Sequence, residues 1–140
     1  MSSVPFHYLD LRTFCYETEA ERRVTDALET FLPDDTDVER TVTEGHHNDR
    51  IVVLAVRVER AQEMRHILNA LSTSMKFEGF VDEVADRVND DCAFFLRLDK
   101  QRAYRGDIAP GDGIQLRGKV EAYPAKRANA IDNLRTYLSE

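Results

Sequence analysis

The segment Ile114–Tyr123, with the sequence IQLRGKVEAY, alternates apolar or small residues with polar ones along its whole length. Alternation with a period of two is typical of a β-strand that buries one face and exposes the other. The positions that we expect to face solvent are Gln115, Arg117, Lys119, Glu121 and Tyr123. We therefore predict a half-buried strand whose solvent side carries two cations.

Four segments that precede this strand also have strand patterns. They are residues 6–16 (FHYLDLRTFCY), 37–44 (DVERTVTE), 51–58 (IVVLAVRV) and 92–100 (CAFFLRLDK). The turn GHHND joins the second segment to the third, so we expect a two-stranded hairpin across residues 37–58. In the fourth segment Phe95, Arg97 and Asp99 share the face opposite Phe94 and Leu98.

Helical spacing of apolar residues marks four helices, with apolar faces in Val24–Phe31, Met64–Leu71, Phe77–Val88 and Ile131–Leu138. A T-x-x-E capping box at Thr18 and Glu21 would start the first helix, and Pro33 ends it. We expect a break near Ser72–Ser74 between the second and third helices, and Pro124 at the first position of the last. This order of elements predicts an α+β two-layer sandwich, a mostly antiparallel sheet with helices packed on one face, in a single domain over residues 1–140.

The composition is that of a globular protein, with 42% hydrophobic and 32% charged residues. No apolar run approaches the roughly 20 residues that span a bilayer, and the first residues lack the pattern of a secretory signal. We therefore expect a cytoplasmic protein in which Cys15 and Cys92 are buried free thiols. The basic residues are almost all arginine and acidic residues number 26, which is typical of a halophilic protein.

Positive charge is concentrated in one part of this acidic chain. The net charge is -7, yet residues 97–127 hold eight cationic side chains against four acidic ones. A local excess of cations favours a polyanion as partner, while a solvated basic face paired with carboxylates is the alternative. We read Lys100–Gly106 as a polar loop beside the strand that carries Arg117 and Lys119. The residues expected to contact RNA through phosphates, bases or sugars are Arg97, Lys100, Arg102, Tyr104, Arg105, Arg117, Lys119, Tyr123, Lys126 and Arg127.

The segment EGHHND, residues 44–49, is a second cluster with chemical potential. Adjacent histidines point in different directions and cannot supply the three or four ligands that zinc requires. We expect an exposed turn in which His46 and His47 are candidates for RNA contacts, since imidazole rings can stack on bases. An enzyme that uses these histidines with Asp49 is the least favoured hypothesis, and we expect no metal and no cofactor. The chain has neither a GxxxxGK[ST] nor a GxGxxG loop.

Several blocks of the sequence resemble those of an archaeal family of RNA-binding proteins that is also described as a predicted exosome subunit. The blocks are FHYLDLRTFCYETE, RTVTEGHHNDRIVVL, FFLRLDKQRAYRGD and GDGIQLRGKVEAYPAKR, and they cover nearly the whole chain in the same order. The fold of that family is similar to the ribosomal protein of the large subunit that binds 5S rRNA. The resemblance implies an α+β sandwich that binds RNA, and it brings no catalytic residues to this chain.

These observations lead to one main hypothesis and one alternative. We expect a non-catalytic RNA-binding protein that acts in RNA processing, in exosome-associated turnover or in ribosome assembly. Its partners would be structured RNA and proteins of those assemblies. The alternative is an adaptor that docks on an RNA-processing complex through protein contacts, its arginines meeting acidic surfaces without touching RNA.

Overall fold

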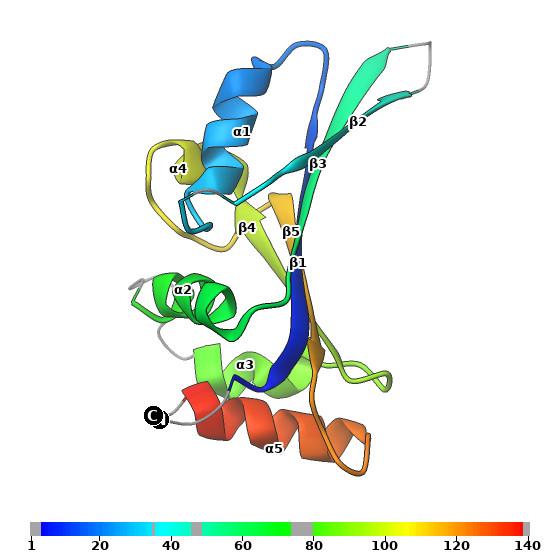
Figure 1. Cartoon of the computed structure of the whole chain (residues 1–140), viewed down its shortest axis with the longest axis vertical. Coiled ribbons are helices and arrows are strands. Elements are labelled where there is room, and N and C mark those ends of the chain that lie inside the picture. Colours follow the sequence, from blue (N-terminus) through cyan, green and yellow to red (C-terminus); the bar gives the residue numbers. More distant parts are fainter. Residues whose placement is uncertain (1–3, 35, 46–48, 74–79, 139–140) are drawn as a thin grey trace.

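The computed structural model describes residues 4–34, 36–45, 49–73 and 80–138 (Figure 1). The elements follow in the order β1 (Phe6–Cys15), α1 (Glu21–Glu29), β2 (Glu39–Glu44), β3 (Arg50–Val58), α2 (Ala61–Ser72), α3 (Phe80–Arg87), β4 (Ala93–Asp99), α4 (Lys100–Tyr104), β5 (Gly113–Val120) and α5 (Arg127–Leu138). The α+β class is confirmed. None of the described helices is long and apolar enough to cross a membrane.

The five strands form one antiparallel sheet in the order β2-β3-β1-β5-β4. The hairpin expected across residues 37–58 is confirmed as β2 and β3. The first strand lies at the centre, where Leu11 is opposite Val56 of β3 on one side and Leu116 of β5 on the other. Segments at the two ends of the sequence are therefore neighbours in the sheet.

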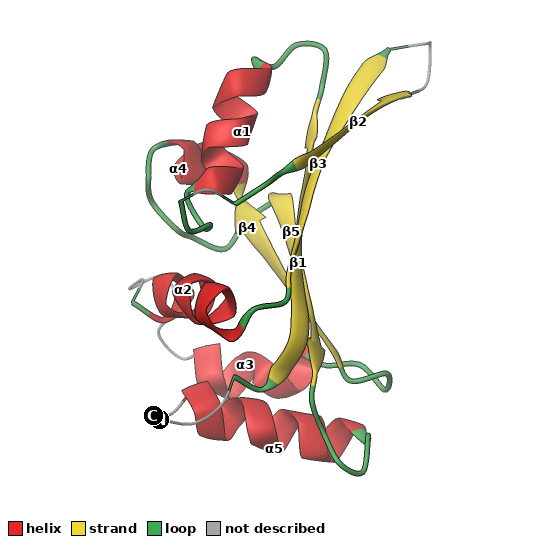
Figure 2. Cartoon of the chain, viewed as in Figure 1, coloured by secondary structure: helices red, strands yellow, loops and turns green. Residues whose placement is uncertain are grey.

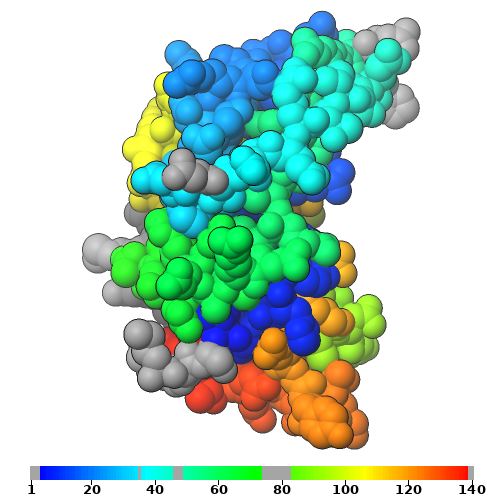
Figure 3. All heavy atoms as spheres, in the orientation of Figure 1, coloured from blue at the N-terminus to red at the C-terminus, as the bar shows by residue number. Residues whose placement is uncertain are grey.

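The helices cover one face of the sheet, as the sequence predicts (Figure 2). At one end α1 packs against α4, and at the other α3 packs against α5. None of the five described helices lies on the opposite face, which we call the open face (Figure 1). The molecule is elongated, with the β2–β3 hairpin at one end and α5 at the other (Figure 3).

The alternation read from the sequence decides which side chains of β5 enter the core. Ile114, Leu116 and Val120 are buried beneath the helices. Gly118 shares this face, and a Cβ there would lie 2.6 Å from a carbon of the Phe6 ring and 2.7 Å from a methyl carbon of Leu9. Only glycine leaves room for this contact, because protein cores are packed to crystal-like density.

Two helix starts differ from the expectation. The first helix begins at Glu21 after Ala20, which offers no side-chain cap, so the predicted capping box at Thr18 is wrong. The chain before the helix is held instead by Glu19, whose carboxylate accepts a hydrogen bond from the Tyr16 backbone N–H at 3.1 Å. Likewise Pro124 does not open α5, because its carbonyl accepts a hydrogen bond from the Lys126 N–H in a turn ahead of the helix.

The other helix predictions hold where the structure describes them. The apolar face of α2 is buried through Met64, Ile67, Leu68 and Leu71. The second helix ends at Ser72, at the position of the expected break, while Ser74 and Phe77 fall outside the described residues. Both cysteines are buried free thiols, as expected. Burial and the nearby carboxylates of Glu19 and Glu21 raise the pKa of the Cys15 thiol.

Candidate nucleic-acid interface

The open face brings together outward side chains of three adjacent strands. Strand pairing places Arg12 of β1 opposite Gln115 of β5, and Gln115 opposite Arg97 of β4. Neighbouring strands lie about 5 Å apart, so Arg12 and Arg97 flank Gln115 at a separation of about 10 Å. The adjacent row runs from Asp10 through Arg117 to Phe95 in the same order of strands.

Aromatic rings accompany the arginines of this face. The guanidinium carbon of Arg117 lies 5.6 Å from the centre of the Phe95 ring, and that of Arg12 lies 4.9 Å from the centre of the Phe14 ring. These distances fall within the range of cation–π contacts. The pairs therefore present flat rings next to delocalised cations, which are the groups that bind unstacked bases and phosphates.

One arginine of the open face is committed to a carboxylate. Arg57 of β3 donates two hydrogen bonds to Asp10, at 2.8 and 2.9 Å, and stacks on Tyr8 with 4.0 Å between its guanidinium carbon and the ring centre. The hydrogen bond and charge of Asp10 raise the pKa of Arg57 above its usual value. Asp10 is thereby neutralised, and it does not offset the charge of the neighbouring arginines.

Arg12, Arg97 and Arg117 are free to meet an external anion. No carboxylate among the described residues forms an ion pair with any of them. All three are exposed on the open face. Three guanidinium groups held close together without counterions favour binding of a phosphate chain.

The surface between these side chains is hollowed. A hollow of about 480 Å³ is lined by residues of β1, β4 and β5, namely Asp10, Arg12, Phe95, Leu96, Arg97, Gln115, Leu116 and Arg117. A second hollow of about 300 Å³ lies at the outer edge of β4 and extends to Asp86–Asn89 at the end of α3. We call them the sheet hollow and the edge hollow.

Three of the residues expected to contact RNA lie on the open face. Arg97 and Arg117 both line the sheet hollow. Lys119 stands opposite Tyr8 of β1 and Ala93 of β4, and its ammonium group donates a hydrogen bond to the Asp91 carbonyl. The structure thus places Arg97 and Arg117, together with Lys119, on one surface.

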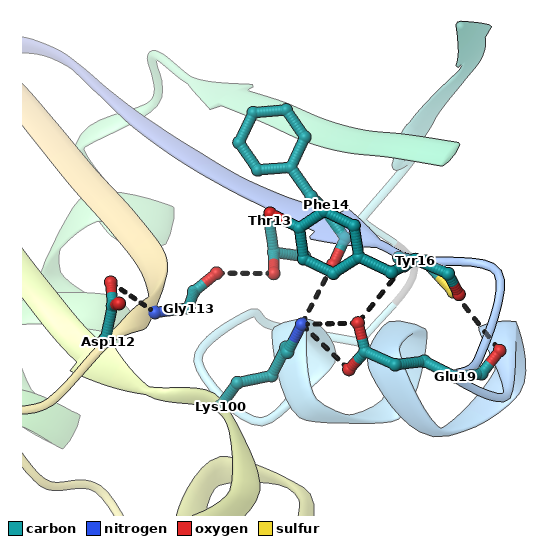
Figure 4. A network of polar contacts seen from close by, with 8 residues as sticks. Thr13, Phe14, Tyr16, Glu19, Lys100, Asp112 and Gly113 are labelled. Carbon is teal, nitrogen blue, oxygen red and sulfur yellow. Dashed lines mark hydrogen bonds and ion pairs between the residues drawn. The ribbon is translucent and has the colours of Figure 1, made fainter. Parts of the chain in front are cut away.

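Lys100 does not belong to this surface. Its side chain is only 13% exposed, and its ammonium group donates hydrogen bonds at 2.9 Å to the Phe14 carbonyl and to the Glu19 carboxylate (Figure 4). The same group lies 5.4 Å from the centre of the Tyr16 ring. Lys100 therefore ties the start of α4 to the end of β1, and the expectation of a solvent-exposed cation is wrong.

Most of the segment expected as a loop from Lys100 to Gly106 is helical instead, because Lys100–Tyr104 form α4. The carboxylate of Asp99 accepts a hydrogen bond from the Arg102 N–H at 2.9 Å and caps this helix. Because α4 packs against α1, it belongs to the helix layer on the far side of the sheet from the open face (Figure 1). Arg102 of α4 pairs with Asp107, which follows the helix, at 3.4 Å.

None of the remaining predicted residues lines either hollow. Tyr104, in α4, is stacked with Arg23 of α1 at 5.4 Å, and Arg105 follows it at the end of the helix. Tyr123 is 98% exposed in the loop after β5, and Lys126 is exposed just before α5. The guanidinium group of Arg127 donates hydrogen bonds to the carbonyls of Val88 and Ala85 at the end of α3. The ten residues therefore do not form one strip, and RNA contact by any of them stays untested.

The two histidines of the predicted turn, His46 and His47, lie outside the described residues. Among the residues that are described, no three His, Cys, Asp or Glu side chains are grouped so as to hold a metal ion. His7 is exposed and lies 3.4 Å from a carboxylate oxygen of Glu121.

Sequence reasoning missed four side chains of the open face. They are Tyr8, Arg12 and Phe14 of β1, and Phe95 of β4, which was placed on the outer face of its strand without a role. The available signal was the alternation in FHYLDLRTFC, which puts Tyr8, Arg12 and Phe14 opposite the buried Leu9 and Leu11. What alternation could not supply was the pairing of β1 with β5.

Comparisons with known proteins identify relatives of this chain. The family model described as RNA binding matches residues 8–120. The RNA-binding protein PAB1135 from Pyrococcus abyssi is 29% identical over 94% of this chain and 93% of its own length. The uncharacterized protein MJ0213 from Methanocaldococcus jannaschii is 29% identical over 77% of this chain and 78% of its own length.

Solved structures share the fold. Mth689, a DUF54 protein from Methanothermobacter thermautotrophicus, superposes with a TM-score of 0.81 at 39% identity, covering 95% of this chain and 98% of its own. The DUF54 protein AF2318 from Archaeglobus fulgidus has the same TM-score at 23% identity, over 94% of this chain and 98% of its own. At that identity it shows the fold alone. The family model covers most of the sheet, including every residue that lines the sheet hollow. The chain therefore belongs to the RNA-binding family that this model describes.

Proposed function

We propose that this protein is a non-catalytic RNA-binding protein whose RNA interface is the open face of the sheet over β1, β5 and β4. The observation that carries the proposal is the group formed by Arg12, Arg97 and Arg117. These arginines are exposed without an ion-pair partner in the described chain, and they surround a hollow with an aromatic ring in its wall.

The electrostatics of the whole molecule make a defined patch necessary. The net charge of -7 repels RNA at long range. Binding must therefore come from short-range contacts in which cations replace the counterions of the phosphates. The open face can provide these contacts. Asp10 is the carboxylate among the residues that line the sheet hollow, and its charge is already neutralised by Arg57.

The test compares two double variants with the same change of charge on opposite sides of the sheet. Arg97→Ala with Arg117→Ala removes two cations from the sheet hollow, whereas Arg102→Ala with Arg105→Ala removes two from α4. RNA binding is measured by fluorescence anisotropy against salt concentration. We expect the first variant to bind more weakly and to lower the salt slope by about 0.7 to 0.9 for each phosphate that the protein no longer neutralises.

The α4 variant serves as the control for net charge. We expect its affinity and salt slope to stay close to those of the wild type, because its arginines lie in the helix layer. If both variants lose affinity equally, binding follows total charge and the open face is not the interface. If neither variant changes the slope, the proposed function in this form is wrong.

We assign the biological role to RNA processing, in exosome-associated turnover or ribosome assembly. The resemblance of the sequence blocks to the archaeal family supports this role. Crosslinking in cells followed by sequencing of the bound RNA separates the two settings, because ribosome assembly predicts an enrichment of ribosomal RNA precursors. Recovery of a protein complex without crosslinked RNA would favour the adaptor alternative.

A further inference from the structure

The Phe95 side chain stands at the boundary between the two hollows. Of the described residues, Phe95, Leu96 and Arg97 alone line both of them. The side chain of Leu96 is buried in the core, so Phe95 and Arg97 form the ridge between the hollows. Phe95 is 44% exposed, a large apolar surface to leave in water on the edge strand of a sheet.

The ring of Phe95 is already oriented by a cation. Arg117 lies over one face of the ring, with 5.6 Å from its guanidinium carbon to the ring centre. Phe95 also lines the edge hollow, and we take the ring face away from Arg117 as the face open to a planar ligand. A base that stacks there would have the guanidinium groups of Arg97 and Arg117 next to its phosphates, because both arginines line the adjoining sheet hollow.

The edge hollow has a different character from the sheet hollow. Its lining includes Asp86, which repels a phosphate, and Arg87, whose Nε is buried without a hydrogen-bond partner in the described chain. Arg87 is not a free cation, since its guanidinium group pairs with Glu83 at 3.0 Å. A neutral base or ribose suits this mixed lining better than a phosphate does.

These contacts define the class of RNA. We propose that the interface binds unpaired RNA, with one base stacked on the free face of Phe95 and the strand crossing the edge of β4 from the sheet hollow to the edge hollow. The inference rests on the proposed function, since the same arginines hold the phosphates. Bases inside a duplex are stacked and paired, and they cannot turn onto a protein ring, whereas bases of single strands, loops and bulges can.

The protein has no tryptophan, which allows a direct test of stacking. Phe95→Trp places a single indole fluorophore at the ridge, and Tyr104→Trp places one on α4 at nearly equal exposure, 43% against 44%. We expect a single-stranded RNA of about 12 nucleotides to quench the emission of the first variant and not of the second. The same strand annealed to its complement should bind at least several-fold more weakly and quench less.

Alanine variants give the size of the effect. A stacked base contributes about 1 to 3 kcal/mol by alanine substitution, so we expect Phe95→Ala to weaken binding of the single strand by about 5- to 150-fold. Tyr104→Ala should stay within about twofold of the wild type. Both rings are exposed, so we expect both alanine variants to remain folded, and melting curves check this.

The outcomes separate this inference from the proposed function. If Arg97→Ala with Arg117→Ala weakens binding while Phe95→Ala does not, or if the duplex binds as well as the single strand, the open face binds RNA but the stacking site is wrong. If the double arginine variant has no effect either, the proposed function fails as well. Quenching of Phe95→Trp by the single strand alone, together with weaker binding by Phe95→Ala, supports the site.

Discussion

Replacing Lys100 by methionine tests whether this residue holds the fold together or binds RNA. The Lys100 ammonium group is the only described link between the Phe14 carbonyl, at the end of β1, and the Glu19 carboxylate, ahead of α1. Methionine keeps the unbranched stem but leaves both acceptors without this donor. The variant therefore removes the polar contacts of the side chain and little of its packing.

The magnitude follows from burial. Removing one partner of a fully buried ion pair costs about 3 to 5 kcal/mol. The side chains of Lys100 and Glu19 are 13% and 23% exposed, so water replaces part of the interaction that the variant removes. We expect the free energy of unfolding to fall by about 2 to 3 kcal/mol. For a chain of 140 residues this corresponds to a melting temperature lower by roughly 8 to 12 °C, at about 4 °C per kcal/mol.

The assay is thermal unfolding followed by circular dichroism, with Lys126→Met as the matched control. Lys126 is exposed and its side chain has no hydrogen-bond or ion-pair partner among the described residues, so its replacement should change the free energy of unfolding by less than about 0.5 kcal/mol. A double variant with Glu19→Gln should destabilise by less than the sum of the single changes, because the two residues share one contact.

Two results would refute this reasoning. Equal melting temperatures for Lys100→Met and Lys126→Met would show that the ion pair contributes nothing to stability. A decrease of RNA affinity in Lys100→Met as large as that of the double arginine variant, at a temperature where both remain folded, would return Lys100 to the RNA interface.

Two other predictions concern the core and the buried thiol. Gly118→Ala should destabilise the protein by about 1 to 3 kcal/mol in urea unfolding, because the added methyl group would overlap the Phe6 ring and Leu9. An unchanged midpoint of urea unfolding would mean that the core relaxes freely at this point. In a Cys92→Ala variant, native Cys15 should react with a thiol reagent far more slowly than the unfolded chain, because burial raises its pKa and the thiolate is the reactive form. The folded protein keeps the Cys15 thiol proton at a pH where the unfolded chain has released it. The free energy of unfolding should therefore fall as the pH rises from the ordinary cysteine pKa toward the raised pKa of Cys15. Rapid labelling of the native protein at neutral pH would contradict this prediction.

The sequence by itself determined which residues of each strand face outward. Alternation in IQLRGKVEAY places Arg117 and Lys119 on the solvent side of β5, and the structure agrees. The same rule separates Arg97 and Phe95 from the buried Leu96. Inward or outward orientation follows from the backbone geometry of a strand, which is a local property, so a short stretch of sequence suffices to predict it.

Local patterns were less reliable at the ends of helices. The capping box at Thr18 and the helix start at Pro124 follow general preferences, yet the structure uses neither. Glu19 is engaged instead by Lys100, a residue 81 positions further along the chain. A cap contributes only about 1 kcal/mol, so a long-range contact of similar or greater strength can displace the helix start.

Only the tertiary structure decided which cations act together. Positions 97–127 are close in sequence, but the sheet divides them, with Arg97 and Arg117 on the open face and Arg102 in the helix layer. Arg12 joins the first two because β1 pairs with β5 across about a hundred residues of chain, as in the pairing of Arg12 with Gln115. Strand order and register depend on how all the apolar faces pack at once. For that reason the membership of the arginine cluster is a property of the whole fold, while the orientation of each member is a property of its own strand.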